Sequence, residues 1–185
     1  LLYELEQNKK VFISAPTSFG KTSIVNEYIL GNYKQLNNIV FIVPTNSLLE
    51  ELFQKFARYT KNLGLNYHIS TQIDGTKENR NILFLTPERF LMLVEQENLD
   101  KFDLFIMDEA YKIVNPKNQT ISDFINDRAI RFRKVSEILG RAKNKVFFLS
   151  PFTYTETKSM AEFLKKYNIT KINRTLEYVD REIIN

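Results

Sequence analysis

Short apolar runs rich in β-branched and aromatic residues alternate along the chain with longer segments of helical period. Several of these runs are apolar at every position, as expected for strands that helices cover on both faces. Alternation of this kind is typical of βαβ units, and it predicts an α/β fold with three layers and a mostly parallel central sheet. The predicted strands are residues 11–14, 39–43, 67–70, 82–85, 104–107 and 146–149.

Apolar residues at helical spacing predict helices between these strands. The stripe over residues 48–56 follows Ser47 and Glu50, which are placed as a capping box. Gly31 and Gly140 each follow a helical segment, where a C′ glycine commonly ends a helix. Later helices are expected over residues 121–139 and 155–167, with one more short strand between residue 168 and the end of the sequence.

The composition excludes several classes of site and location. The absence of Cys removes disulfides, thiolate metal sites and cysteine nucleophiles, and it suits a reducing compartment, so we expect a cytoplasmic protein. The apolar runs are far shorter than the roughly 18 residues of a membrane span, so no membrane partner is expected. The net charge of +4 favours polyanionic partners only weakly.

Because the sequence opens on Leu1 in what reads as the end of a helix, we expect a piece of a longer protein.

The first predicted strand runs into a phosphate-loop pattern, with Ala15 in place of the first glycine. Such a loop turns its backbone N–H groups toward phosphates at a helix N-terminus. Gly20 lets the backbone come close, Lys21 is expected to reach the β- and γ-phosphates, and the Thr22 hydroxyl to ligate Mg²⁺. A chance match is the alternative, but the strand and helix fall where the motif requires them. The expected nucleotide-binding residues are Ala15, Thr17, Ser18, Phe19, Gly20, Lys21 and Thr22.

The predicted strand 104–107 ends in two adjacent acids, Asp108 and Glu109. Parallel sheets bind their ligands at the carboxyl ends of the strands, where these acids lie. Asp108 can hold the hydration shell of Mg²⁺ opposite Thr22, while Glu109 can polarise an attacking water. The alternative is a helix N-terminus at which the acids only complement the helix dipole. Together with the phosphate loop, the pair favours hydrolysis, with Lys21, Asp108 and Glu109 as catalytic residues.

Taken in order, these motifs resemble the first motor domain of superfamily two helicases and translocases, the group that contains the DEAD-box and DEAH-box proteins. Motifs I and II are common to P-loop ATPases, whereas the Pro-Thr and Thr-Pro-Glu elements at strand-to-helix junctions narrow the resemblance. The matching segments are residues 15–22 (motif I), 44–47 (motif Ia), 86–88 (motif Ib), 108–111 (motif II) and 149–151 (motif III).

The resemblance implies a RecA-like fold in which the strand ending at Ser150 lies between the strands that end at motifs I and II. It also implies ATP as the nucleotide. Residues 1–170 would form the N-terminal RecA-like ATP-binding domain, and residues 171–185 would begin a linker toward a second RecA-like domain. Relatives take a positively charged finger from that second domain, so we expect the chain alone to bind ATP but to hydrolyse it poorly.

Two departures from the family pattern concern coupling. Tyr111 stands where the family usually has Asp or His, and motif III reads Ser150-Pro151-Phe152 rather than Ser-Ala-Thr. In relatives these positions link ATP turnover to the grip on nucleic acid. We therefore assign Tyr111 and Ser150 to coupling and expect that coupling to be altered.

Two predicted helix N-termini are candidate contacts for a DNA or RNA backbone. Free N–H groups beside hydroxyl and amide side chains suit phosphodiester oxygens and read no sequence, although ordinary helix capping explains the same residues. Farther along, a basic helix could add phosphate contacts, but a solvated face balanced by acids is the favoured interpretation. The basic residues are Arg128, Arg131, Arg133, Lys134, Arg141, Lys143 and Lys145, and the acids are Asp123, Asp127 and Glu137. The lone His68 is interpreted as structural. The expected nucleic-acid contacts are Pro44, Thr45, Asn46, Thr86 and Arg89.

These observations favour an ATP-dependent nucleic-acid motor domain that couples hydrolysis to unwinding or translocation. One alternative is a double-stranded DNA translocase subunit of a restriction or phage-defence system, because the two classes share their motifs. Another is a non-motor nucleotide-dependent interaction module, in which the altered motifs II and III mark lost coupling.

Overall fold

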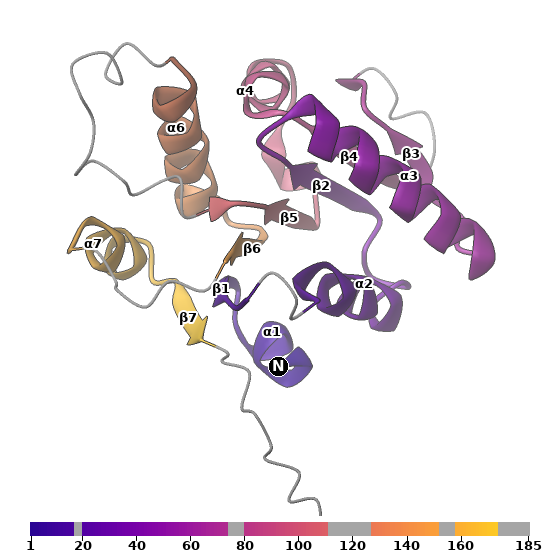
Figure 1. The fold of residues 1–185 in the computed structure, drawn as a ribbon, viewed down its shortest axis with the longest axis horizontal. Helices are drawn as coiled ribbons and strands as arrows, with labels where there is room; N and C mark the ends of the chain where they lie inside the picture. The colour runs from indigo at the N-terminus through magenta and orange to yellow at the C-terminus, as the bar shows by residue number, and fades with distance from the viewer. Residues whose placement is uncertain (17–19, 74–79, 111–126, 152–157, 174–185) are drawn as a thin grey trace, which may run out of the picture.

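A single sheet of seven parallel strands forms the centre of the computed structural model (Figure 1). The structure describes residues 1–16, 20–73, 80–110, 127–151 and 158–173. The strand order is β3-β4-β2-β5-β6-β1-β7, and every neighbouring pair is parallel. The strands are β1 (Lys10–Ser14), β2 (Asn38–Ile42), β3 (His68–Ser70), β4 (Asn81–Leu85), β5 (Leu104–Met107), β6 (Lys145–Ser150) and β7 (Thr170–Asn173).

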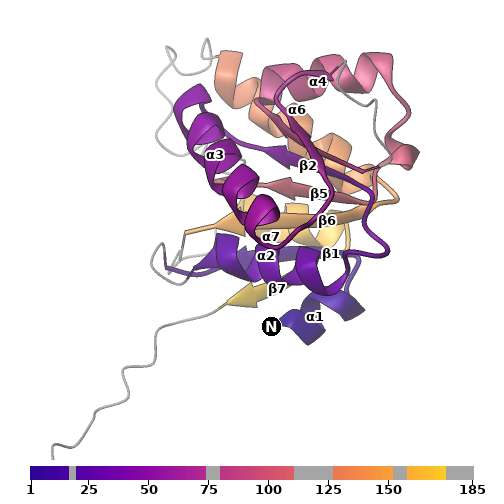
Figure 2. The same cartoon turned by 90° about the vertical axis from the view of Figure 1, so that its right-hand side faces the viewer.

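Helices cover both faces of this sheet, so the expected three layers are present (Figure 2). The helices α1, α2 and α3 pack on one face, and α4, α6 and α7 pack on the other. Their bounds are α1 (Leu2–Gln7), α2 (Lys21–Gly31), α3 (Asn46–Asn62), α4 (Pro87–Gln96), the 3₁₀ turn η3 (Leu99–Lys101), α6 (Asp127–Arg141) and α7 (Lys158–Lys166).

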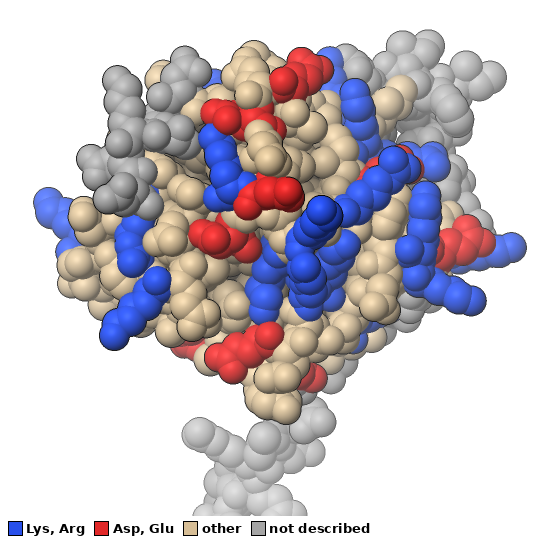
Figure 3. Space-filling model, turned by 180° about the vertical axis from the view of Figure 1, so that it is seen from behind, with Lys and Arg blue, Asp and Glu red and all other residues tan. Residues whose placement is uncertain are grey.

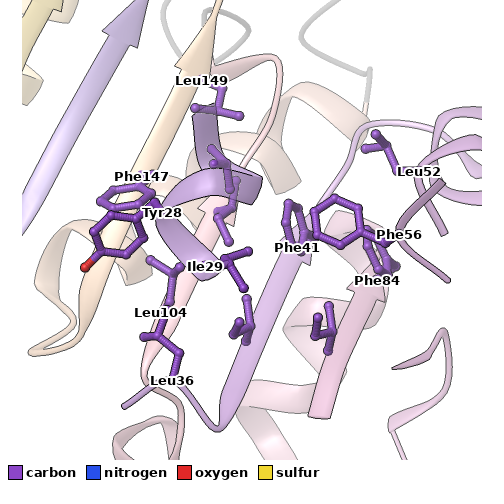
Figure 4. Close-up of a cluster of buried hydrophobic side chains, with 14 of the residues drawn as sticks. Tyr28, Ile29, Leu36, Phe41, Leu52, Phe56, Phe84, Leu104, Phe147 and Leu149 are labelled. Carbon is purple, nitrogen blue, oxygen red and sulfur yellow. The ribbon is translucent and has the colours of Figure 1, made fainter. Parts of the chain in front are cut away.

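Alternate residues of each strand enter opposite halves of the core, because successive side chains of a strand point to opposite faces. On the face of α2 and α3, Phe41 stacks on Phe84 with ring centroids 4.8 Å apart, and Phe56 of α3 meets both rings edge-on (Figure 4). Tyr28 of α2 meets Phe147 of β6 in the same way at 5.0 Å. The completely apolar strands of the sequence are thus explained by burial on both sides.

Strand β6 pairs with β1 on one side and with β5 on the other. This confirms the expected position of the strand that ends at Ser150, between the strands of motifs I and II. The short last strand is also present: β7 pairs with β1 and extends the sheet to Asn173, three residues past the expected domain boundary at residue 170. The expected linker lies outside the described residues from residue 174 onward.

Three local expectations are wrong. Helix α3 is capped by Thr45, whose Oγ1 accepts a hydrogen bond from the Leu48 N–H, so Ser47 does not cap it. Gly31 is the last residue of α2 and has no positive φ; the cap is Asn32. Gly140 lies inside α6, where a Cβ would come within 2.6 Å of the Tyr167 ring. That glycine permits a close helix contact and does not end the helix.

Within the described ranges, we find no helix with both the length and the apolar character needed to cross a bilayer.

Candidate nucleotide-binding site

The turn between β1 and α2 is described at its two ends, around Ala15 and Gly20. Gly20 is the N-cap of α2 with φ of +74°, a left-handed conformation that a side chain would strain. Its carbonyl accepts a hydrogen bond from the Ile24 N–H at 3.1 Å, which starts the helix. Helix α2 thus begins at Lys21, as the motif requires. Thr17, Ser18 and Phe19 lie outside the described residues.

The Lys21 side chain folds back over this turn. Its Nζ donates hydrogen bonds to the carbonyl oxygens of Ala15, at 2.8 Å, and Pro16, at 3.1 Å. Partial burial lowers the pKa of Lys21, and the charges of Asp108 and Glu109 act in the opposite direction. The ammonium group therefore lies in the field of both acids. The phosphate loop and the acidic pair thus share one edge of the sheet.

The acidic pair follows β5 in a tight turn. The Asp108 N–H continues the sheet by donating to the Ile42 carbonyl at 2.9 Å, and the Asp108 Oδ1 accepts from the Glu109 N–H at 2.8 Å. Glu109 has φ of +56°, which is uncommon for a residue with a side chain. Held backbone strain of this kind is often found at functional positions. The sequence contains no signal for this conformation.

Motif III lies beside the phosphate loop because β6 pairs with β1. The Ala15 N–H donates to the Ser150 carbonyl at 3.2 Å. The Ser150 hydroxyl donates to the Pro151 carbonyl at 3.0 Å, and Ser14 reaches the same carbonyl oxygen at 3.4 Å. Sequence reasoning missed buried Ser14, because one hydroxyl in an apolar strand carries no positional signal. Tyr111 lies outside the described residues.

The donor set at this edge fits a magnesium ion bound together with phosphate groups. Thr22 in the first turn of α2 offers a hydroxyl, and Asp108 offers a carboxylate. Among the described residues there is no group of three or more His, Asp or Glu side chains that could hold a metal alone. Mg²⁺ commonly keeps several waters and binds through one or two carboxylates plus substrate phosphates, so it does not need such a group.

The expected nucleic-acid contacts lie at the same edge of the sheet as the phosphate loop. Thr45 follows β2 and caps α3, and Thr86 follows β4 and caps α4 by accepting from the Arg89 N–H at 3.5 Å. The structure brings these two caps together, because β2 and β4 are neighbours and Ile42 pairs with Leu85. The Arg89 guanidinium donates to the Thr71 carbonyl at 2.9 Å, a contact that the sequence did not indicate.

Two members of the basic segment before β6 have acidic partners. Arg131 contacts Glu88 at 3.2 Å and so joins α6 to the first turn of α4, and Arg133 contacts Glu137 at 3.5 Å. Arg128 has no described side chain. These pairs agree with the interpretation of the segment as a balanced, solvated face.

Comparison with known proteins identifies the family. A sequence model described as "DEAD/DEAH box helicase" matches residues 1–150. The chain belongs to the DEAD/DEAH box helicase family. Family membership implies ATP binding, typically with Mg²⁺, and ATP-dependent helicase activity as the general activity of its members.

Several relatives of this helicase domain are known. Anti-bacteriophage protein B of Escherichia coli is 30% identical over 154 residues, which are 80% of this chain and 20% of that protein. ATP-dependent DNA helicase Hel308 of Thermoplasma volcanium is 26% identical over 116 residues, 60% of this chain and 17% of that protein. The chain therefore spans about a fifth of the length of these curated relatives.

A solved structure supports the RecA-like fold of the helicase domain. The crystal structure of a hypothetical ATP-dependent RNA helicase from Sulfolobus tokodaii superposes with a TM-score of 0.63 at 21% identity, covering 92% of this chain and 49% of that chain.

Proposed function

We propose that the chain is the ATP-binding motor domain of a nucleic-acid helicase and that one edge of its sheet performs the ATP chemistry. The observation that carries the proposal is the position of Lys21, which bonds the loop carbonyls and lies in the field of Asp108 and Glu109. A phosphate chain at this edge would meet the loop, the ammonium group and the acids at once.

Each residue at this edge has a separate part in the proposal. The N–H groups around Gly20 bind phosphate oxygens, since they lie at the positive end of α2. Lys21 exchanges its two carbonyl partners for β- and γ-phosphate oxygens. Thr22 and Asp108 hold Mg²⁺, which when bound neutralises phosphate charge. Glu109 accepts a proton from the attacking water.

Nucleic acid is proposed to lie across the caps of α3 and α4. Thr45, Asn46 and Thr86 offer hydroxyl, amide and helix N-terminal N–H groups to phosphodiester oxygens, and Pro44 and Arg89 flank them. Tyr111 and Ser150 are proposed to couple this grip to the nucleotide. Both caps follow strands of the same sheet as the phosphate loop, so movement of the strand ends can connect the two sites.

The test is ATP hydrolysis by the whole protein with and without DNA or RNA. We expect nucleic acid to stimulate hydrolysis, and both Lys21→Ala and Glu109→Gln to abolish the stimulation. The 185-residue chain alone is expected to bind ATP and turn it over slowly, because the stabilising finger would come from a second domain. If no nucleic acid stimulates the whole protein, the motor proposal fails and a nucleotide-dependent interaction module remains.

A second candidate is a double-stranded DNA translocase in phage defence. The similarity to Anti-bacteriophage protein B is the observation that favours it. Movement along duplex DNA without strand separation, measured by displacement of a bound triplex-forming strand beside a strand-separation assay, distinguishes this candidate from a helicase.

A further inference from the structure

Three stretches that are far apart in the sequence meet where the strands of the sheet begin, on the edge opposite the phosphate loop. Lys10 begins β1, and Lys145 begins the neighbouring β6. The Lys10 ammonium donates to the Gly140 carbonyl in the last turn of α6. Gly140 in turn faces the ring of Tyr167, directly after α7. The ends of α6 and α7 therefore lie together beside the start of β1.

This junction carries a group of exposed cations that we call the basic edge surface: Lys9, Arg141, Lys143, Lys165 and Lys166. Figure 3 shows Lys and Arg side chains gathered across the centre and right of this side of the molecule. Among the described residues, no ion pair joins these five cations to an acid. Lys166 lies over the Tyr167 ring at 5.0 Å.

Complementing helix ends accounts for only part of this charge. Arg141 lies in the last turn of α6, and Lys165 and Lys166 lie in the last turn of α7, but Lys9 and Lys143 lie outside the helices. Two other lysines already bond helix-end carbonyls. Lys10 bonds the end of α6, and Lys145 donates to the Leu5 and Glu6 carbonyls at the end of α1. Burial lowers the pKa of Lys10, and the charge of Lys9 lowers it further, while Tyr167 acts in the opposite direction. Lys9 and Lys10 thus place two adjacent positive charges at this junction.

The composition of the surface points to a nucleic-acid backbone as its partner. Protein interfaces commonly have an apolar centre, but no exposed large apolar residue of the described chain lies in α7 or in the last turn of α6. Those residues are Leu2, Tyr3, Leu30, Leu63, Met92 and Ile130. Lysine ammonium groups on flexible stems suit phosphates and read no bases. Base stacking is not indicated, because the Tyr167 ring packs on Gly140 and Phe163.

We propose that the basic edge surface binds the phosphodiester backbone of nucleic acid at a place separate from the caps at Thr45 and Thr86. The two places lie on opposite edges of the sheet, so they hold different segments of a bound molecule. Binding here does not require ATP and does not depend on the chemistry proposed for Lys21 and Glu109.

The test compares two double charge reversals in the whole protein. Lys143→Glu with Lys166→Glu changes the basic edge surface without touching the lysines that bond helix ends. Lys34→Glu with Lys61→Glu, two exposed lysines beyond α2 and in the last turn of α3, changes the net charge equally on the other helical layer. Affinity for a labelled DNA duplex of about 30 base pairs is measured without ATP over a range of salt concentrations.

We expect the first variant to bind the duplex about tenfold or more weakly. The plot of the logarithm of its binding constant against the logarithm of salt concentration becomes less steep by about 1.8, which corresponds to two phosphate contacts. The control keeps the slope of the unchanged protein, and neither variant changes basal ATP turnover. Lys143→Gln with Lys166→Gln shows a smaller affinity loss with a similar slope change, which separates lost contacts from misfolding.

Equal slopes for the variant and its control overturn the proposal, as does an affinity loss at unchanged slope. The proposal is also overturned if the first variant loses binding of an acidic protein while the salt slope of its DNA binding is unchanged. This result can be distinguished from a failure of the proposed motor function. If nucleic acid does not stimulate ATP turnover, the motor proposal fails. If the salt slope of DNA binding still falls in the first variant only, the proposal for the basic edge surface stands.

Discussion

Two lysines on opposite edges of the sheet make the same type of contact for different reasons. Lys21 donates to the Ala15 and Pro16 carbonyls at 2.8 and 3.1 Å, and Lys145 donates to the Leu5 and Glu6 carbonyls at 2.7 and 3.0 Å. Burial lowers the pKa of both. Asp108 and Glu109 oppose this effect at Lys21, whereas Glu6 opposes it at Lys145.

The carbonyls themselves explain the difference. Lys145 meets the C-terminal carbonyls of α1, which have no partner inside the helix and carry the negative end of its dipole. Lys21 meets a loop that leads into the positive end of α2, where an anion is the better partner. We therefore expect the Lys145 bonds at a helix C-terminus to be structural and the Lys21 bonds beside a helix N-terminus to be replaceable by phosphate.

The largest expected effect concerns Glu109, one of the two acids whose charges act on Lys21. Glu109→Gln keeps the size of the side chain but removes the proton acceptor, so we expect ATP turnover by the whole protein to fall by about 10²–10⁴-fold. The affinity for ATP, measured by equilibrium binding, stays within a few-fold. Unchanged turnover would contradict the role of Glu109 as the base.

Lys21→Ala tests whether the Lys21 contacts are replaceable. We expect ATP turnover to fall by about 10²–10³-fold, because one preorganised donor to the phosphates is lost. The free energy of unfolding, measured in urea, changes by less than about 1 kcal/mol, since the loop carbonyls return to water. A large loss of stability would place Lys21 with the structural lysines.

The opposite edge has its own test in two helical glycines. Gly140→Ala places a Cβ 2.6 Å from the Tyr167 ring, and we expect a loss of about 1–3 kcal/mol despite the better helix propensity of Ala. Gly31→Ala is the matched control, because nothing lies within 4 Å of the added Cβ, and it is neutral or stabilising. Urea unfolding of both variants measures the difference; equal midpoints would exclude the close contact.

Lys145→Met keeps the apolar stem and removes the two bonds to α1. We expect a loss of about 1–2 kcal/mol of unfolding free energy, because two carbonyls lose a charged donor. ATP affinity is unchanged, which is the reverse of the Lys21→Ala pattern. Unfolding free energy and ATP affinity together therefore distinguish the structural role of Lys145 from the proposed nucleotide-binding role of Lys21. A change in the ATP affinity of Lys145→Met would contradict this distinction.

The last expected effect is a pH dependence at Tyr67, directly before β3. The buried Tyr67 hydroxyl donates to the Leu36 carbonyl at 2.6 Å, and burial raises the pKa of Tyr67 to about 12. The unfolded chain releases this proton near pH 10, so this hydroxyl stabilises the fold below pH 10 and loses that contribution as the pH rises to about 12. In urea unfolding at alkaline pH, Tyr67→Phe is expected to lose less stability over this range than the unchanged protein does. An equal loss would show that another group causes the dependence.

Most of the fold was predictable because burial on both faces left a simple pattern. The strands from β1 to β6 lie within one or two residues of the apolar runs, and the family resemblance implied the position of β6 between β1 and β5. Gly31 and Gly140 show what the apolar pattern cannot predict. A glycine after an apolar stripe can be a C′ residue or a point of close packing, and only the position of Tyr167 decides for Gly140.

The candidate site was predictable as a set of residues but not as a set of contacts. The phosphate-loop spacing singled out Gly20 and Lys21, because backbone approach to phosphate demands those residue types. The closeness of Lys21 to Asp108 and Glu109 depends on the sheet that joins β1, β5 and β6. Local sequence carries no record of such tertiary relations. For the same reason, the helix-bonding roles of Lys10 and Lys145 were not foreseen.

The placement of β1 has a consequence for biosynthesis. Both strands that pair with β1 follow residue 144, so the strand leading to Gly20 and Lys21 leaves the ribosome long before any neighbour exists for it. Pairing between segments so distant in sequence forms slowly, because a large loop must close first. The proposed nucleotide site is therefore completed late in synthesis, because a translation product that stops before residue 144 contains Gly20 and Lys21 but lacks both strands that pair with β1.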